Sequence, residues 1–317
     1  MTVQDKKIYI GIDVSKTSLD VYILPNNKYM QFKNGPEDIQ KLVKKLSVFS
    51  NALIVMESTG GYEKPVAHAL QEASGAVSIV NPRQVRDFAK ALGKLAKTDK
   101  IDAEVIALFA SKIEPKANLV YDKEHNELAD NNTRRRQLIE MIKMEKNRLD
   151  KATPSQRESI KRVLDLLEDE LKKINEAQAK VIESHPEFSK KKKILESVTG
   201  IGAVTATAML ASLPELGSVG SKQISALAGL APYNCDSGAM KGKRMIWGGR
   251  ASVRSALYMA TLVAIRHNSQ IKMFYERLCL AGKAKKSAII ACMHKLLIII
   301  NAMIKNGSCW HAPTVSA

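Results

Sequence analysis

The chain lacks the sequence patterns of a zinc protein and of a disulfide-stapled one. Its four cysteines are widely spaced and include no CxxC pair, which argues against both a zinc site and a disulfide framework. Its six histidines form no metal-ligand spacing, so we assign them structural roles. We expect reduced, structural thiols at the cysteines, which are Cys235, Cys279, Cys292 and Cys309.

The chain also lacks an apolar leader and an uninterrupted apolar run of membrane length. Its first residues, MTVQDKKIYIGIDV, contain no separate apolar segment followed by a small-residue cleavage site. The apolar stretch from Ala288 to Ile304 is interrupted by His294 and Lys295, so we expect a buried helix there. These absences predict a cytoplasmic protein that is not held in a membrane.

Acidic residues are few relative to basic ones. There are 32 Asp and Glu against 49 Lys and Arg in 317 residues, a net charge of +17, which attracts polyanions. The basic residues are spread along the whole chain and no polybasic segment flanks an apolar span, so nucleic acid is a better candidate partner than a membrane. Aromatic residues are only 5% of the chain, which suits binding to a nucleic-acid backbone better than base stacking.

The first hundred residues alternate between strand and helix patterns. Strand patterns cover 7–14, 18–24, 29–34, 52–57 and 77–80, and helix patterns cover about 36–49, about 62–73 and the residues from 82 onward. Three strands followed by helix, strand, helix, strand and helix predict a ribonuclease-H-type α/β fold, a mixed sheet flanked by helices. In that fold the first and fourth strands are adjacent and central.

Four acidic residues of this region lie where a metal site would need them. Asp13 and Glu57 each close a strand pattern, so their carboxylates would emerge at strand ends. Asp99 and Asp102 are three residues apart at the start of an expected helix, which places both on one helical face. Grouped carboxylates without a cation are electrostatically costly, whereas Mg²⁺ or Mn²⁺ prefers clusters of oxygen ligands. We therefore expect a hard-metal site.

A weakly patterned connector from about residue 111 to 131 leads into a charged helical region. This region runs from Arg134 to Glu183 and is divided at Thr153-Pro154-Ser155. Its second segment has the alternating 4-3 spacing of a coiled-coil seam, at Ile160, Leu164, Leu167, Leu171, Ile174, Gln178 and Val181. The pattern predicts a helical hairpin that pairs with itself or with another copy, and a simple spacer is the alternative.

A mostly helical region begins near Lys193. Gly200 and Gly202 lie between two helix patterns and resemble a helix-hairpin-helix, whose glycines let backbone amides approach phosphates closely. The basic run from Lys190 to Lys193 precedes them and favours DNA contact. The alternative is an ordinary turn with Gly at the helix C-cap.

A second group of candidate residues surrounds Ser237-Gly238. A serine that attacks phosphate needs nearby cations or metal to stabilise the charge that develops, and the cations here are close in sequence. Ser-Gly also marks ordinary turns, so the serine is one candidate among several on this basis. The candidate phosphate- or DNA-backbone-binding residues are Lys241, Lys243, Arg244, Arg250 and Arg254.

Taken together, these motifs resemble a known family. IGIDVSK, VMESTGGY and KTDKIDAEVIA in the first half, with TGIGAVTA, GLAP, SG and WGGRASVRSALYMA in the second, are similar to the DEDD-type transposases of bacterial insertion sequences. The bridge-RNA-guided recombinases were recognised in that family. The resemblance runs from about residue 7 to 110 and from about 194 to 278, and it needs both halves to separate this family from other ribonuclease-H-fold nucleases.

The resemblance implies roles for individual residues. Asp13, Glu57, Asp99 and Asp102 match the acidic residues that bind Mg²⁺ in the family's RuvC-like domain, and Ser237 matches the serine that attacks DNA. The charged helical middle matches a coiled coil that joins protomers as a dimer or tetramer, so that the acidic site of one subunit can meet the serine of another. The resemblance also implies a structured noncoding RNA that pairs with target and donor DNA, and action at the bacterial nucleoid.

We therefore expect three regions and one recombination activity. Residues 1–112 would form the RuvC-like catalytic domain, 113–190 the connector and coiled-coil segment, and 191–317 a helical transposase domain. The enzyme would cut and rejoin DNA through a phosphoserine link with metal assistance. A metal-dependent junction-resolving nuclease that uses activated water, and a binding scaffold without chemistry, are the alternatives.

Overall fold

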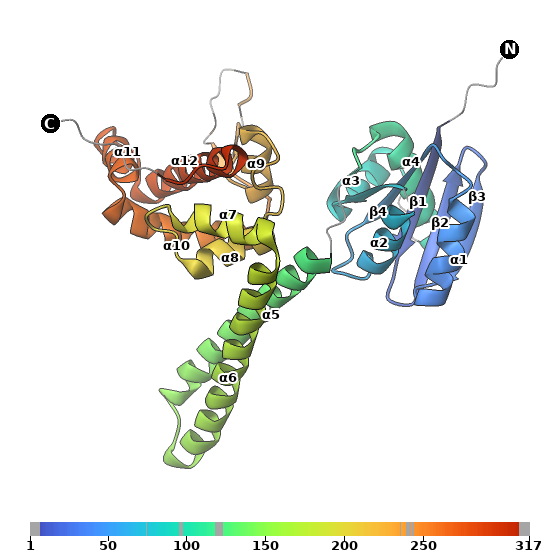
Figure 1. The fold of residues 1–317 in the computed structure, drawn as a ribbon. Coiled ribbons are helices and arrows are strands. Elements are labelled where there is room, and N and C mark those ends of the chain that lie inside the picture. The colour runs from blue at the N-terminus through green and yellow to red at the C-terminus, as the bar shows by residue number, and fades with distance from the viewer. Residues whose placement is uncertain are drawn as a thin grey trace. The chain divides into compact units, whose positions relative to one another are not determined.

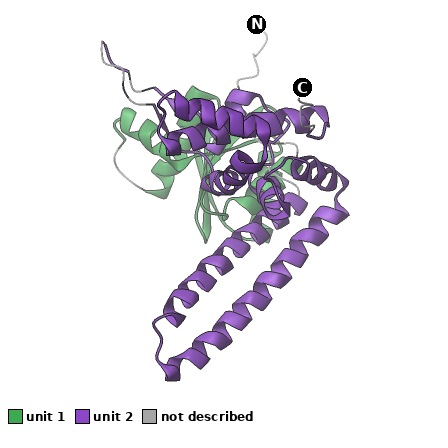
Figure 2. Ribbon diagram, turned by 90° about the vertical axis from the view of Figure 1, so that its left-hand side faces the viewer, with its two compact units in different colours: residues 1–121 green, residues 122–317 purple. Residues whose placement is uncertain are grey.

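A computed structural model describes residues 7–73, 75–94, 98–117, 123–234, 236–238, 242 and 244–310. The predictions made for Cys235, Lys241, Lys243 and His311 lie outside these residues. The chain divides into two compact units, residues 1–121 and 122–317 (Figure 2). Each unit has its own buried core.

The N-terminal unit is built on the predicted mixed sheet (Figure 1). Its strands are β1 (Ile8–Val14), β2 (Ser18–Leu24), β3 (Lys28–Lys33), β4 (Ala52–Glu57) and β5 (Ala76–Val80), in the order β3-β2-β1-β4-β5. The pairs β1–β2 and β2–β3 are antiparallel, and the pairs β1–β4 and β4–β5 are parallel. The expected ribonuclease-H-like arrangement, with β1 and β4 central, is therefore confirmed.

Helices cover both faces of this sheet. The buried residues of α1 (Pro36–Leu46) and α2 (Lys64–Glu72) join the core that contains alternate residues of β1 and β2. Those of α3 (Pro82–Ala91) and α4 (Asp99–Ile113) pack with the opposite side chains of β4 and β5. Alternation along each strand thus supplies two apolar faces, which is what a two-sided α/β sheet requires.

The helical middle is a hairpin that belongs to the C-terminal unit. Helices α5 (Lys123–Leu149) and α6 (Pro154–Ser184) run antiparallel beside each other, and the break falls at the predicted Thr153-Pro154 (Figure 1). The expected connector up to residue 131 was wrong, because α5 already begins at Lys123. Leu128 is the one apolar residue in this first stretch that is buried, and it packs into the C-terminal core, a long-range contact with no periodic signature.

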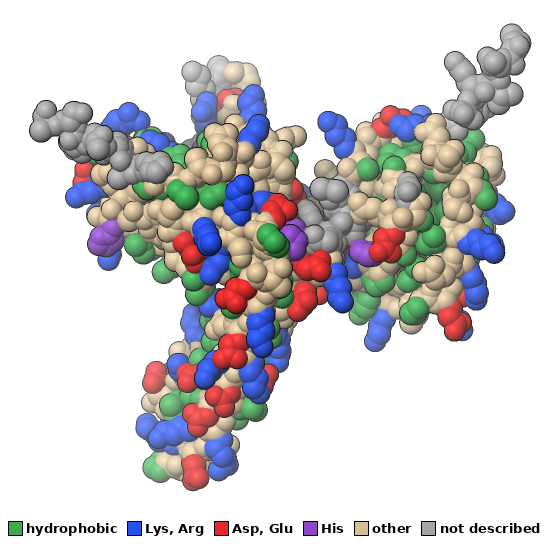
Figure 3. All heavy atoms as spheres, viewed as in Figure 1, with side chains coloured by type: hydrophobic (Ala, Val, Ile, Leu, Met, Phe, Trp, Pro, Cys, Tyr) green, Lys and Arg blue, Asp and Glu red, His purple; other side chains and the backbone are tan. Residues whose placement is uncertain are grey.

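The positions predicted as a seam on α6 are the more shielded ones of that helix. Leu164, Gln178 and Val181 are buried, and on α5 Leu138 and Ile142 are buried as well. Lys, Arg, Asp and Glu side chains are interspersed over the rest of the hairpin (Figure 3). This pattern agrees with helices that pair along one stripe, and the coiled-coil geometry itself stays a prediction.

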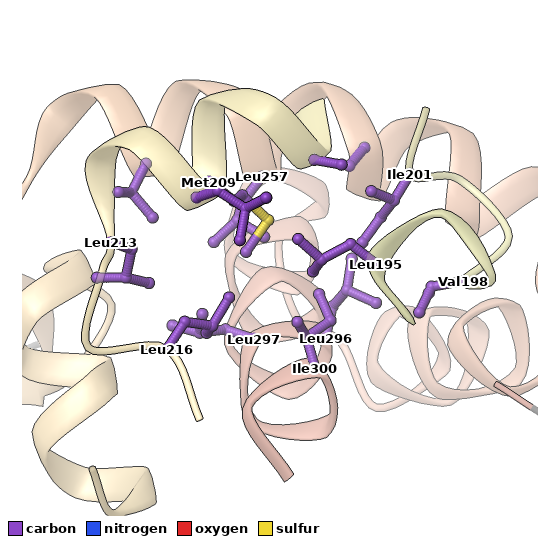
Figure 4. Close-up of a cluster of buried hydrophobic side chains, with 14 of the residues drawn as sticks. Leu195, Val198, Ile201, Met209, Leu213, Leu216, Leu257, Leu296, Leu297 and Ile300 are labelled. Carbon is purple, nitrogen blue, oxygen red and sulfur yellow. The ribbon is translucent and has the colours of Figure 1, made fainter. Parts of the chain in front are cut away.

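The rest of the C-terminal unit is a helical domain around one large core (Figure 4). Its elements are α7 (Pro186–Glu196), α8 (Ala203–Ser212), α9 (Ser221–Ala228), β6 (Pro232–Tyr233), β7 (Met245–Ile246), α10 (Ala251–His267), α11 (Ser269–Leu280) and α12 (Lys285–Asn306). Leu195, Met209, Leu257 and Leu296 from four different helices are fully shielded in this core.

Helix α12 is the predicted buried apolar helix. It is the one helix among the described residues that is long and apolar enough to cross a membrane, and half of its most apolar window is buried in the unit. Cys292, Leu297 and Ile300 are shielded completely. This burial explains the apolar composition of α12, which is part of the core of the unit. Among the described cysteines, Cys279, Cys292 and Cys309 are free thiols, as expected.

Candidate functional site

The strand register brings Asp13 and Glu57 to the same edge of the sheet. Ile12 of β1 pairs with Met56 of β4 in a parallel ladder, so the next residues, Asp13 and Glu57, are neighbours at the carboxyl ends of the two central strands. Both side chains are half-buried. This is the edge at which open α/β sheets place their ligands.

Helix α4 carries the other two acidic residues across the same face. A Cβ on Gly11 would lie 2.3 Å from the backbone nitrogen of Ala107 and 2.4 Å from the carbonyl oxygen of Ala103. Only glycine therefore lets the helix lie directly on β1. Because Gly11 and Asp13 are two residues apart on one strand, they face the same side, toward the helix turn that carries Asp102.

The pKa of Asp13 reflects this crowding. Burial, together with the nearby carboxylates of Asp102, Asp20 and Asp99, raises the pKa of Asp13 from the ordinary value near 3.8 to about 6. The first turn of α4 is fixed by Thr98, whose hydroxyl accepts from the backbone nitrogen of Ile101. The structure thus brings Asp13 close to Asp99 and Asp102, and the register brings it beside Glu57.

A fifth carboxylate, Asp20, lies next to Asp13 in the antiparallel β1–β2 ladder. Asp20 is only 1% exposed, so its carboxylate does not face solvent. It accepts hydrogen bonds from Ser18 Oγ at 3.1 Å, the Tyr29 hydroxyl at 2.6 Å and Gln31 Nε2 at 2.8 Å. The bond to Asp20 raises the pKa of Tyr29 to about 12. The signal was present in the sequence, since Asp20 interrupts an apolar strand at a position that must face the helix.

Glu63 has a local structural role. Its carboxylate accepts from the Thr59 hydroxyl at 2.8 Å and from the backbone nitrogens of Thr59 and Gly61 at 3.1 and 2.8 Å. Burial acts to raise the pKa of this carboxyl group, but hydrogen bonds from the Glu63 backbone, Thr59 and Gly61 outweigh it and lower the pKa. Glu63 therefore closes the loop that follows Glu57.

The chemistry of this acidic site fits a hard divalent cation. All its candidate ligands are carboxylate oxygens, and a cation would relieve the repulsion that raises the pKa of Asp13. Among the described residues, no group of three or more His, Cys, Asp and Glu side chains is already arranged around one point to hold a metal ion. The backbone thus gathers the four residues on one edge, and the assignment of Asp13, Glu57, Asp99 and Asp102 as ligands stays a prediction.

Ser237 lies in the other compact unit, on the loop between β6 and β7. These two short strands pair through Pro232–Ile246 and Tyr233–Met245. Ser237 is exposed, and Gly238 after it has a positive φ of 56°. Asp236 accepts from the backbone nitrogen of Gly242 at 3.0 Å, which closes part of the loop.

The glycines around this loop pack against each other. Gly229 and Gly249 adopt φ values of +68° and +63°, and Gly248 also has a positive φ. A Cβ on Gly229 would lie 2.1 Å from the carbonyl oxygen of Gly248, and one on Gly249 would lie 2.2 Å from the nitrogen of Gly229. The GLAP and WGGR motifs therefore meet at the base of the loop, where we call them the glycine junction.

Two of the predicted DNA-binding arginines are used in this junction. Arg250 makes a bidentate ion pair with Glu215, with Nη2 and Oε1 at 2.7 Å, and it also donates to the carbonyl oxygen of Ser212 at 3.2 Å. Arg254 donates to the carbonyl oxygens of Gly248 and Ala228. These contacts support positioning of the loop, a role that the sequence analysis missed because Glu215 lies 35 residues away.

Arg244 is the remaining described cation of the predicted set, and it is exposed beside β7. It is available for contact with a polyanion. The roles of Arg244, Arg250 and Arg254 in DNA binding stay predictions, as do those of Lys241 and Lys243 outside the described residues.

Gly200 and Gly202 lie in the turn between α7 and α8. Gly200 has a φ of +107°, and a Cβ there would lie 2.8 Å from the carbonyl oxygen of Ala260 on α10. Close packing within the protein therefore explains this glycine. Gly202 precedes α8 and has open space around it. The helix-hairpin-helix and its phosphate contact stay predictions.

Comparisons with known proteins agree in both halves of the chain. Residues 10–153 match a DEDD transposase family, and residues 192–276 match the family described as transposase IS116/IS110/IS902. Pilin gene-inverting proteins of Moraxella bovis and Moraxella lacunata are each 30% identical over 315 residues, which cover 94% of this chain and 96% of theirs. A 42 kDa uncharacterized protein of insertion element IS900 from Mycobacterium paratuberculosis is 30% identical over 129 residues, 39% of this chain and 32% of its own length.

The family and the site chemistry point to the same enzyme class. A DEDD domain implies dependence on divalent metal ions in general, in agreement with the carboxylate edge built by β1, β4 and α4. The match extends through the hairpin to the domain that carries Ser237. The chain therefore belongs to the IS116/IS110/IS902 family of transposases and is a DNA recombinase.

Proposed function

We propose that the protein cuts and rejoins DNA through a covalent link to Ser237, with the acidic site acting in the same reaction. The observation that carries this proposal is the exposed position of Ser237 at a loop whose base is fixed by the glycine junction. An exposed nucleophile on a fixed base can reach a phosphate and still be aimed.

The chemical step conserves one phosphate ester. The Ser237 Oγ attacks phosphorus and loses its proton, while the bond from phosphorus to the leaving sugar oxygen breaks and that oxygen takes up a proton. The strand is then held as a phosphoserine ester. Attack by a sugar hydroxyl of another strand reverses the step and rejoins the DNA without ATP.

We assign the acidic site to binding Mg²⁺ or Mn²⁺ through Asp13, Glu57, Asp99 and Asp102. A bound divalent cation would supply Lewis-acid stabilisation of charge on the attacked phosphate and the leaving oxygen. The protein's part is to hold these oxygens at one sheet edge. The pKa of about 6 for Asp13 means that its carboxylate form, the one that binds metal, prevails at neutral pH.

The two Moraxella relatives are named for inverting a pilin gene. Inverting a segment requires that cut ends be joined to new partners, so we extend this kind of reaction to the present chain. The net charge of +17 provides for binding of DNA, and also of the structured noncoding guide RNA that we propose as the source of sequence choice.

We also propose that the α5–α6 hairpin joins protomers into a dimer or tetramer. Ile139, Met144, Val163 and Leu166 are apolar and between 39% and 61% exposed on its two helices. A second copy would shield this surface. The protein would then act in the bacterial cytoplasm, at the nucleoid, as an assembly in which one subunit can supply the acidic site and another the serine.

A strand-cleavage assay tests the proposal. Full-length protein is incubated with Mg²⁺, any RNA encoded beside the gene and labelled DNA spanning the element junction, and products are resolved on a denaturing gel. Wild-type protein should give a protein–DNA adduct, and both Ser237→Ala and Asp13→Ala should give none.

Free cut DNA that persists in Ser237→Ala would overturn the phosphoserine mechanism. That result would instead favour a metal-dependent nuclease in which the acidic site activates water. Glu37→Gln, on the exposed first turn of α1, is a matched control for loss of an acidic group in the N-terminal unit, and it should cleave like wild type.

A further inference from the structure

A large groove opens beside the strands that carry the Ser237 loop. It has a volume of about 1050 Å³ and lies between β6, β7, α11 and α12. Its floor is apolar and includes Ile246, Ile290 and Ile298, all of them half-buried. This volume is at the upper end of that of small-molecule pockets, so it leaves room for more than one flat group of nucleobase size.

The rim of the same groove is cationic. Arg244, Lys283 and Lys295 line it, and no Asp or Glu is found among the described residues of its lining. Lys295 lies over the ring of Phe274, with Nζ 4.4 Å from the ring centroid, so one cation and one aromatic ring are already held together. An apolar floor with a basic rim complements a strand whose bases are apolar on their faces and whose backbone is anionic.

The groove is tied to the Ser237 loop by the short β6–β7 pair. Pro232 and Ile246, which pair with each other, both line it. Ser237 follows Pro232 by five residues, which limits their separation to about 18 Å of extended chain. DNA whose phosphate meets Ser237 would thus continue past this groove within a few nucleotides.

Exposed aromatic side chains gather at the same place, although aromatics are scarce in this chain. Tyr233 is 51% exposed on β6 and Trp247 is 64% exposed immediately after β7. Met245, which pairs with Tyr233, is also 64% exposed. Exposed rings beside a basic groove are the usual means of holding unpaired bases.

We propose that this groove binds an unpaired stretch of the DNA strand beside the phosphate that Ser237 attacks. Bases lie against the apolar floor, and the backbone phosphates lie along Arg244, Lys283 and Lys295. This inference depends on the proposed function in one respect: the role of Ser237 identifies the phosphate beside which the strand binds. The groove's preference for single-stranded over duplex DNA is an independent property.

Fluorescence anisotropy with full-length protein tests this binding separately from cleavage. All variants carry Ser237→Ala, and the probes are fluorescein-labelled oligothymidylate and a duplex of the same length. Ala291→Trp fills the groove, whereas Ala302→Trp places the same bulk on an exposed part of α12 outside the groove lining. We expect Ala291→Trp to weaken single-strand binding at least tenfold and duplex binding less than twofold, and Ala302→Trp to change neither.

A charge variant covers the case in which the bulky residue disturbs folding. Lys283→Ala removes one exposed rim cation, and it should lower the slope of log affinity against log salt for the single strand by about 0.7. Lys305→Ala, an exposed lysine of α12 outside the lining, should change the slope less than this. Equal effects of the groove and control variants, or equal loss of duplex and single-strand binding, would overturn the proposal.

The two proposals fail in different assays. If the groove is not the single-strand site, Ala291→Trp in an otherwise wild-type chain leaves both binding and adduct formation intact. If Ser237 is not the nucleophile, wild-type protein gives no adduct or Ser237→Ala still gives one, while the selective loss of single-strand binding in Ala291→Trp remains.

Discussion

In the N-terminal unit every acidic candidate is attached to regular structure, whereas in the C-terminal unit Ser237 lies on a loop between two strands of two residues each. Asp13 is the penultimate residue of β1, Glu57 is the last residue of β4, and Asp99 and Asp102 occupy the first turn of a helix. Ser237 depends on the glycine junction and on the Arg250–Glu215 pair, which lie outside its own loop. The sheet and its helix position the acidic site, whereas contacts made by residues outside the loop position Ser237.

This difference suggests that the two units have different tasks in the reaction. Carboxylates that share a cation must keep fixed separations, which strands and helices provide. A nucleophile that forms a covalent link must reach its substrate, and an exposed position on a loop with a fixed base suits it. The same comparison predicts that substitutions of the residues that support the acidic site, such as Gly11, act through folding, whereas substitution of Ser237 acts through chemistry.

Ser237→Ala should show the largest effect on activity with the smallest effect on the fold. Loss of the Oγ nucleophile should reduce strand cleavage by roughly a thousandfold or more. The side chain is exposed, so the thermal midpoint should stay within about 1 °C of wild type. Cleavage rates and melting curves of the same preparation check both parts, and a lowered midpoint would mean that the serine has a structural role instead.

Gly11→Ala should do the opposite and break the frame of the acidic site. The new Cβ would lie 2.3 Å from the backbone of α4, which has no flexible side chain to move away. We expect the N-terminal unit to lose about 3 kcal/mol or more of stability. Urea denaturation measures this loss.

Gly35→Ala is the matched control for that substitution, because nothing lies within 4 Å of a Cβ at that position and its φ of −141° is accessible to alanine. It should cost less than about 1 kcal/mol. Similar losses in the two variants would contradict the close approach of α4 to β1.

Arg250→Ala should have an intermediate effect that is seen in both stability and cleavage. It removes the bidentate pair with Glu215, which is partly exposed, so we expect a loss of about 1–2 kcal/mol in urea denaturation. Cleavage should fall further than stability explains, because the base of the Ser237 loop is released. Arg266→Ala, an exposed arginine of the same α10 helix, should change stability by less than about 0.5 kcal/mol.

A double-mutant cycle with Glu215→Gln sharpens that prediction. If the two side chains stabilise the fold through each other, the double variant should lose less than the sum of the single losses. Additive losses would mean that the pair does not act as a unit.

Asp13→Asn should raise stability in metal-free protein, and the gain should depend on pH. The pKa of Asp13 is raised to about 6 in the fold from about 3.8, so above pH 6 the charged carboxylate disfavours folding, and below pH 3.8 both states are protonated. The melting temperature of the variant should exceed that of wild type at pH 8, and the gap should close between about pH 6 and pH 4. Mg²⁺ should narrow the gap at pH 8 by stabilising wild type.

Asp87→Asn is the control for this pH series, because Asp87 lies on α3 with 58% of its side chain exposed. Its difference from wild type should stay small at every pH. A gap for Asp13→Asn that is constant from pH 4 to pH 8 would contradict the crowding of carboxylates around that residue.

The sheet and its acidic edge could be predicted from the sequence because their signals are local. Strand alternation marks the strands, Pro25 and Asn26-Asn27 separate the second strand from the third, and the acidic residues directly follow apolar runs. The alternation along β2 places Asp20 on the face toward α4, but its hydrogen-bond partners Tyr29 and Gln31 lie on the next strand and have no local signal.

The C-terminal unit was less predictable because its signals are long-range. The start of α5 depends on Leu128 packing into a core formed by helices beyond residue 186. The arginines and glycines around Ser237 looked like a phosphate site, yet Gly229, Gly249 and Arg254 contact one another. The glycines mark a backbone with positive φ values, the contacts of Arg250 and Arg254 within the protein are long-range and have no local signal, and the phosphate site itself stays a prediction.

The most direct test of the central claim is to locate the covalent bond. Wild-type protein trapped on labelled junction DNA with Mg²⁺ would be digested with nuclease and protease, and the modified peptide sequenced by mass spectrometry. The proposed mechanism predicts a nucleotide on Ser237, and no such adduct in Asp13→Asn under the same conditions. A nucleotide on another residue, or full cleavage with no modified peptide, would contradict it.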